Sequence, residues 1–242
     1  MNISRRTFLA ASAATPTRAN TLRPDARRMR GIFIILATPF TDTKAVDYAD
    51  LEREVEFLAR CGVHGMVWPQ IASEYALLTV EERMRGMEVI AKAARNRRAA
   101  LVLGIQGPNL EAALAYAHRA EELAPDAVIA IPPTEARSLE EVRRYYAALA
   151  AVARRPFFVQ TTGGPKNVPI SPEFVIALAR EFPQLGYVKE EAEPVIARIE
   201  KLAGARPAIK AIFTGNGGRN LLYEMRLGVD GNMPGAAYAD LH

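Results

Sequence analysis

Residues 99–132, AALVLGIQGPNLEAALAYAHRAEELAPDAVIAIP, contain one complete strand–helix–strand unit. The apolar segments 99–106 and 127–132 predict buried strands, and residues 109–124 predict an amphipathic helix that Asn109 caps. A helix that joins two strands of one sheet carries the chain back across that sheet. The unit therefore predicts parallel strands.

The same alternation runs outward in both directions and gives eight strands and seven helices. Eight such units predict an α/β fold of the closed (β/α)8 (TIM) barrel type. A doubly wound open sheet is the alternative, but no Gly-x-Gly-x-x-Gly motif follows the first strand. We expect strands at 31–40, 65–69, 99–106, 127–132, 156–162, 187–192, 208–214 and 231–237, and helices at 48–61, from 79, 109–124, from 138, 171–182, 194–205 and 219–228.

Several helix starts carry capping signals. Thr79 with Glu82, and Ser138 with Glu141, have the spacing of capping boxes. Pro172 suits the first turn of the helix at 171–182. These local signals support the predicted order of elements.

The N-terminal 30 residues differ from the rest of the chain. They have a net charge of +6, which leaves −2 for residues 31–242 out of a total of +4. Ser4-Arg5-Arg6-Thr7-Phe8-Leu9 resembles a bacterial twin-arginine export signal, which implies a periplasmic or secreted protein. The alternative is a basic tail on a cytoplasmic enzyme. Residues 31–242 form the predicted barrel domain, apparently truncated after strand 8, without the eighth helix and C-terminal helices; an unstable gene fragment is therefore a further alternative.

Composition excludes several function classes. Half of the residues are hydrophobic, which argues against disorder. The mature domain has no excess of basic charge for nucleic acid and no apolar run long enough to cross a membrane. Cys61 is the single cysteine and there are three histidines, so we expect neither an internal disulfide nor a metal site. We also expect no organic cofactor.

Lys189 is the strongest candidate for chemistry. It is one of six lysines and lies inside the strand predicted at 187–192. Alternation along that strand puts Tyr187, Lys189 and Glu191 on one face. If that face lines the barrel interior, desolvation favours the neutral amine, which can attack a ketone and form a Schiff base. The alternative is a lysine that reaches solvent or pairs with Glu191.

Short motifs at the ends of the predicted strands resemble the dihydrodipicolinate synthase / N-acetylneuraminate lyase family of class I aldolases. The resemblance covers about residues 31–242 and implies a TIM barrel that acts on a 2-oxo acid such as pyruvate through a lysine Schiff base, without a cofactor. Lys189 falls on the family's Schiff-base lysine. The motifs are Ala37-Thr38-Pro39-Phe40, residues 73–79 (SEYALLT), Ile131-Pro132-Pro133, Tyr187-Val188-Lys189-Glu190, Thr214-Gly215-Asn216 and Gly231-Asn232-Met233.

The chain also departs from the family pattern. Gln160 replaces the tyrosine that relays protons, and an amide donates a hydrogen bond but does not exchange a proton. Ile71 and Ala72 replace the two hydroxyl residues that hold the substrate carboxylate. Thr134 and Glu135 occupy the positions of a frequent tyrosine pair, and Pro165, next to Lys166, occupies that of a basic residue. Dihydrodipicolinate synthesis itself is therefore not expected; a divergent aldolase, lyase or dehydratase is.

The resemblance suggests roles for most of the candidate residues, and Glu191 is favoured over Glu74 and Tyr75 as the proton carrier because it shares the strand face of Lys189. We expect Lys189 to form the iminium, Gln160 to polarise the substrate and Glu191 to move protons, although Glu191 could equally be structural. The substrate-binding positions fall on Ala72, Ser73, Gly215 and Met233. The partner implied is a small 2-oxo acid, with a homo-oligomer, by resemblance a tetramer, as a further expectation. The competing interpretation is a non-catalytic barrel that binds a keto acid or sugar acid.

Overall fold

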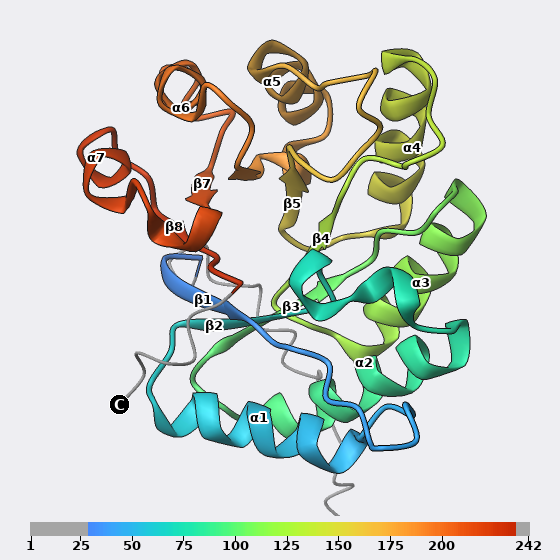
Figure 1. Ribbon diagram of the computed structural model, residues 1–242. Coiled ribbons are helices and arrows are strands. Elements are labelled where there is room, and N and C mark those ends of the chain that lie inside the picture. Colours follow the sequence, from blue (N-terminus) through green and yellow to red (C-terminus); the bar gives the residue numbers. More distant parts are fainter. Residues whose placement is uncertain (1–28, 236–242) are drawn as a thin grey trace, which may run out of the picture.

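The computed structural model describes residues 29–235, which form a closed barrel of eight parallel strands surrounded by helices (Figure 1). The strands follow one another around the barrel in chain order, and β8 pairs with β1 to close it. The predicted TIM barrel is confirmed. The strands are β1 (Gly31–Ile35), β2 (Gly65–Trp68), β3 (Ala100–Gly104), β4 (Ala127–Ala130), β5 (Phe157–Gln160), β6 (Tyr187–Glu190), β7 (Ala211–Thr214) and β8 (Gly231–Asn232).

In the described part of the chain, seven α-helices follow the first seven strands, and four short 3-10 turns lie in the connections. Each parallel connection needs such a crossover, so the helices form the outer layer. The helices are α1 (Tyr48–Arg60), α2 (Val80–Ala94), α3 (Leu110–Leu123), α4 (Leu139–Val152), α5 (Pro172–Glu181), α6 (Val195–Ala203) and α7 (Leu221–Arg226), and the 3-10 turns are η2 (Ile71–Ser73), η3 (Tyr75–Leu77), η4 (Pro183–Leu185) and η5 (Asn216–Gly218).

Alternation along the strands divides the buried side chains into two cores. Those that point outward pack against the helices, and those that point inward fill the barrel. Inside the barrel the Phe213 ring packs edge-on against Phe33 and Phe158, with ring centroids 4.8 and 5.2 Å apart. Because aromatic rings fill this part of the interior, polar chemistry is confined to the carboxyl ends of the strands.

Every strand is shorter than the sequence predicts, and β1 and β8 differ most from their predicted bounds. β1 ends at Ile35 rather than at Phe40, because the following segment turns away and Phe40 forms an isolated bridge to Val46. β8 has two residues, not the seven of 231–237, and residues 236 and 237 lie outside the described part of the chain. Single backbone hydrogen bonds continue beyond both strand ends, from Leu36 to Val67 and from Met233 to Thr214, but the regular ladder does not.

The capping predictions hold with one correction. At Thr79 both hydrogen bonds of the capping box are present. Ser138 accepts from the Glu141 amide, but the Glu141 carboxylate accepts from the Arg137 amide and not from that of Ser138. The predicted second capping box is therefore incomplete, because the side chain reaches one residue further back.

The predicted export signal lies outside the described residues and stays a prediction; of the basic N-terminal arm, the structure describes Met29 and Arg30. Within residues 29–235, no helix follows β8. No helix in that range is long and apolar enough to cross a membrane. Over the same residues, no cluster of three histidine, cysteine or acidic side chains has a geometry suited to a metal ion.

Candidate active site at the carboxyl end of β6

The Lys189 ammonium lies inside the barrel, at the end where β5 and β6 finish. Backbone pairing puts Gln160 next to Lys189 across the two strands. The Lys189 side chain is buried, with 3% of its surface exposed. Its Nζ donates to Gln160 Oε1 at 3.4 Å and lies 3.3 Å from Glu191 Oε1. The structure therefore places the three predicted catalytic side chains in contact.

The Glu191 carboxylate is held from several sides. Its Oε2 accepts from the Thr162 hydroxyl at 2.8 Å and from the Gln160 amide at 3.0 Å. Its Oε1 lies 3.4 Å from the backbone nitrogen of Asn216, which donates to it. One oxygen is thus fixed by Gln160 at the end of β5 and by Thr162 just after it, while the other faces the lysine.

Burial lowers the pKa of the Lys189 ammonium below its ordinary value, because desolvation disfavours the charged form. The Glu191 carboxylate opposes part of this shift through its charge and hydrogen bond. A lysine with a lowered pKa is more often a neutral amine, which is the form that attacks a carbonyl carbon. The site therefore has the electrostatics of a nucleophilic lysine.

Gly215, which follows β7, leaves the space that Glu191 needs. A Cβ atom at this position would lie 1.8 Å from Glu191 Oε1. Gly215 was predicted to position the substrate carboxylate; in the structure it instead adjoins a carboxylate of the chain itself. That face of the site is consequently negative.

Two predicted substrate-binding residues lie on η2 with different exposure. Ala72 is exposed. Ser73 is fully buried, and its hydroxyl donates to the Leu36 carbonyl at 2.6 Å and accepts from the Gln70 amide at 3.0 Å. Both hydrogen bonds hold the chain after β2 against the end of β1. The Ser73 hydroxyl is therefore hydrogen-bonded within the chain, both as a donor and as an acceptor.

Met233 is buried in the interior core together with Phe213 and Ile35, as a wall of the barrel. Its backbone nitrogen donates to the Thr214 carbonyl at 2.7 Å. The side chain therefore adds apolar surface near the site and no polar group.

Sequence reasoning missed Thr162. Residues 160 and 162 are two apart, so an extended chain points both side chains to one side. This two-residue spacing is the sequence feature that could have pointed to Thr162 as a neighbour of the site. The contact with Glu191 depends on how far β5 extends relative to β6, which the sequence does not show.

Sequence reasoning also gave no role to Glu190, which is fully buried behind the site. Its Oε1 accepts from the Thr161 hydroxyl at 2.6 Å and lies 3.0 Å from Arg198 Nε. Because Glu190 alternates with Lys189 and Glu191, it points away from the interior. It joins β5, β6 and α6 and so fixes the backbone that carries the site.

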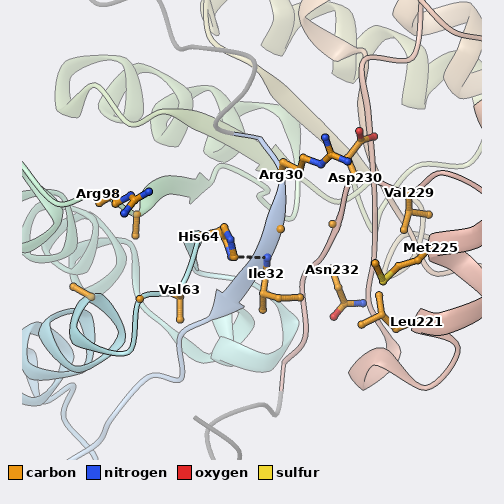
Figure 2. A pocket seen from close by; sticks show the side chains of 15 residues that line it. Arg30, Ile32, Val63, His64, Arg98, Leu221, Met225, Val229, Asp230 and Asn232 are labelled. Carbon is orange, nitrogen blue, oxygen red and sulfur yellow. Dashed lines mark hydrogen bonds between the residues drawn. The ribbon is translucent and has the colours of Figure 1, made fainter. Parts of the chain in front are cut away.

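A separate cavity of about 830 Å³ is lined by residues of β1, β8, α1 and α7, several of which Figure 2 labels. Ile32 of β1 and Asn232 of β8 line it, and His64 accepts a hydrogen bond from the Ile32 amide at 3.3 Å. None of the predicted site residues lines this cavity. The chemistry of Lys189 therefore has no connection with it.

A model of the dihydrodipicolinate synthetase family matches residues 28–238. The chain belongs to this family. The match overlaps the last three residues of the basic N-terminal arm and includes every residue of the candidate site.

Two curated relatives have different activities. The chain is 26% identical over 218 residues to L-2-keto-3-deoxyarabonate dehydratase of Azospirillum brasilense, covering 88% of this chain and 70% of the relative. It is 28% identical over 174 residues to 4-hydroxy-tetrahydrodipicolinate synthase of Methanocaldococcus jannaschii, covering 72% of this chain and 59% of the relative. The chain thus spans between about three fifths and seven tenths of their length.

Solved structures of the family have the same fold. A crystal structure of a dihydrodipicolinate synthase superposes with a TM-score of 0.76 at 26% identity, over 84% of this chain and 69% of that one. A catalytic-lysine mutant of the Ruminococcus gnavus sialic acid aldolase gives 0.80 at 19% identity, over 87% and 68%. The second likeness is one of fold alone.

Proposed function

We propose that this family member is a Schiff-base lyase, an aldolase or a dehydratase, which acts on a small 2-oxo acid. Pyruvate and a sugar-derived keto acid are the substrate types we expect. The observation that carries the proposal is the buried Lys189 nitrogen, in contact with the Glu191 carboxylate and the Gln160 amide at the carboxyl end of the barrel.

The chemistry of this nitrogen implies a ketone substrate, and the family resemblance implies that the ketone belongs to a 2-oxo acid. A neutral amine adds to the ketone carbon of a 2-oxo acid, and loss of water gives an iminium that withdraws electrons from the neighbouring carbons. Family membership supports this assignment, since the relatives include a dehydratase of a keto-deoxy sugar acid. The reaction needs no metal ion or organic cofactor.

Reductive trapping tests the proposal. Incubation with pyruvate and borohydride should add a stable three-carbon group to the protein, located on Lys189 by peptide mass spectrometry. The Lys189→Arg variant keeps a cation but cannot form the imine, and should show no adduct. Lys201→Arg, at an exposed ion pair with Glu173, is the matched control and should be labelled like the wild type.

Absence of an adduct with a panel of 2-oxo acids would contradict an imine mechanism. Binding of the same acids without trapping would then identify the chain as a non-catalytic keto-acid or sugar-acid binder.

A further inference from the structure

Glu191 occupies one definite side of the Lys189 nitrogen. Its Oε2 is fixed by Thr162 and Gln160, and its Oε1 lies 3.3 Å from Lys189 Nζ. The space over Gly215 is taken by this same carboxylate. Any molecule bonded to Lys189 therefore has a fixed negative charge next to its C2 atom.

This charge orients a bound 2-oxo acid. The ketone carbon C2 carries the C1 carboxylate on one side and C3 on the other. In a site shielded from water, two carboxylates on the same side repel each other strongly. The substrate carboxylate is therefore directed away from Glu191, and C3 is directed toward it.

The distances suit proton transfer from C3. In an imine, C3 is two bonds away from the lysine nitrogen, so a carboxylate oxygen in contact with that nitrogen is also within reach of C3. Within residues 29–235, the polar atoms of two side chains contact Lys189 Nζ, and of these Gln160 has an amide that does not exchange protons usefully. Glu191 is the one that can act as a base.

We propose that Glu191 removes the C3 proton of the Lys189-bound 2-oxo acid, and that Thr162 is a positioning residue that aims its carboxylate. This deepens the proposed function and rests on it. The proposal names the residue that replaces the missing proton-relay tyrosine.

The Lys189 nitrogen and Glu191 together supply every proton that imine formation needs. The ammonium passes one proton to Glu191 and attacks C2 as an amine. The C2 oxygen leaves as water after it has taken up the second nitrogen proton and the Glu191 proton, which leaves an iminium beside a carboxylate. Glu191 then takes a proton from C3; the C–H electron pair forms the C2–C3 double bond, and the C–N π pair moves onto nitrogen to give an enamine.

Hydrogen–deuterium exchange at the methyl group of pyruvate measures this step directly. In D2O the wild-type protein should replace the C3 hydrogens with deuterium, seen as loss of the methyl signal in proton NMR. Lys189→Arg gives the background rate. Exchange is expressed per borohydride-trapped imine, so that proton removal is measured apart from imine formation.

Glu191→Gln should still form the trapped adduct but exchange about 100-fold or more slowly per imine. Thr162→Val, which removes the hydroxyl bonded to Glu191 Oε2, should exchange about tenfold more slowly, and Thr162→Ser should restore the rate. A role of Thr162 in folding alone would change thermal stability and leave exchange per imine unaltered.

The outcomes separate the two proposals. A wild-type protein that forms no imine refutes the proposed function. An imine that exchanges as fast in Glu191→Gln as in the wild type refutes the role of Glu191. If Glu191→Gln does not fold, the Thr162 pair decides: exchange lost with valine and regained with serine supports the proposal, and exchange unchanged with valine overturns it.

Discussion

At the scale of single residues, Ser73 shows that a hydroxyl predicted to bind substrate can instead make hydrogen bonds within the chain. It is the sole hydroxyl in Ile71–Ser73, so the sequence favoured it as a ligand for the substrate carboxylate. In the structure it bridges the Leu36 carbonyl and the Gln70 amide. Backbone groups without water need such partners, and a buried serine supplies both.

Ser73→Ala should therefore act on stability. The change leaves a buried donor and a buried acceptor without partners, at a cost of about 1–3 kcal/mol in the free energy of unfolding, measured by urea titration. Imine trapping by the folded variant should stay near the wild-type level. Loss of trapping with unchanged stability would instead assign Ser73 to the substrate.

At the scale of elements, the packing of α2 on β2 depends on one glycine. Gly86 lies in the middle of α2, where alanine is normally the better helix former by about 1 kcal/mol. A Cβ at Gly86 would lie 2.3 Å from the buried Trp68 ring. That ring is held by a hydrogen bond of 3.1 Å from its Nε1 to the Thr38 hydroxyl. Helix propensity and tertiary packing thus favour different residues here.

Gly86→Ala should destabilise the protein by about 1–3 kcal/mol in spite of its better helix propensity, because the rigid ring cannot move away. Thermal and urea unfolding measure the effect. Combining it with Trp68→Phe should cost less than the sum of the two single changes. A stabilising Gly86→Ala would contradict this, because it would show that the Trp68 ring can shift to make room for the methyl group.

At the scale of the whole molecule, the closure of the barrel is linked to α7 through a buried acid. Glu224 of α7 is 2% exposed, and its Oε2 accepts from the Thr214 hydroxyl at 2.6 Å. Thr214 in turn accepts from Asn232 Nδ2 at 3.0 Å. This chain of hydrogen bonds joins β7, β8 and α7 next to the β8–β1 seam. Burial raises the pKa of Glu224 above its ordinary value of 4.5, and the Thr214 hydrogen bond opposes part of the shift.

The stability of the barrel should consequently depend on pH through Glu224. Because the folded state holds this proton more tightly than the unfolded state, the contribution is fully present below pH 4.5 and is lost as pH rises through the raised pKa. Glu224→Gln, which keeps the shape without the titrating proton, should lack this dependence. Unfolding free energies of both proteins from pH 4 to 8 test it, and parallel curves would contradict it.

The sequence by itself determined the order of elements and which residues share a strand face with Lys189. Both follow from patterns among residues that are close together in the sequence. These patterns are the repeat of apolar residues every two positions in strands and every 3.6 in helices, capping residues such as Thr79, and the two-residue spacing of Tyr187, Lys189 and Glu191. The family resemblance rested on the same local motifs, and the family match confirms it.

The tertiary structure decided what surrounds the lysine. Thr162 meets Glu191, and Gly215 makes room for that carboxylate, because strand pairing aligns Gln160 with Lys189 and Lys189 with Phe213. Strand register and loop conformation come from packing between segments that are distant in the sequence, and no local pattern encodes them. For that reason Lys189 and the carboxylate of Glu191 on its face could be predicted from the sequence, while the contacts of that carboxylate with Thr162 and Gly215 and the hydrogen bonds of Ser73 could not.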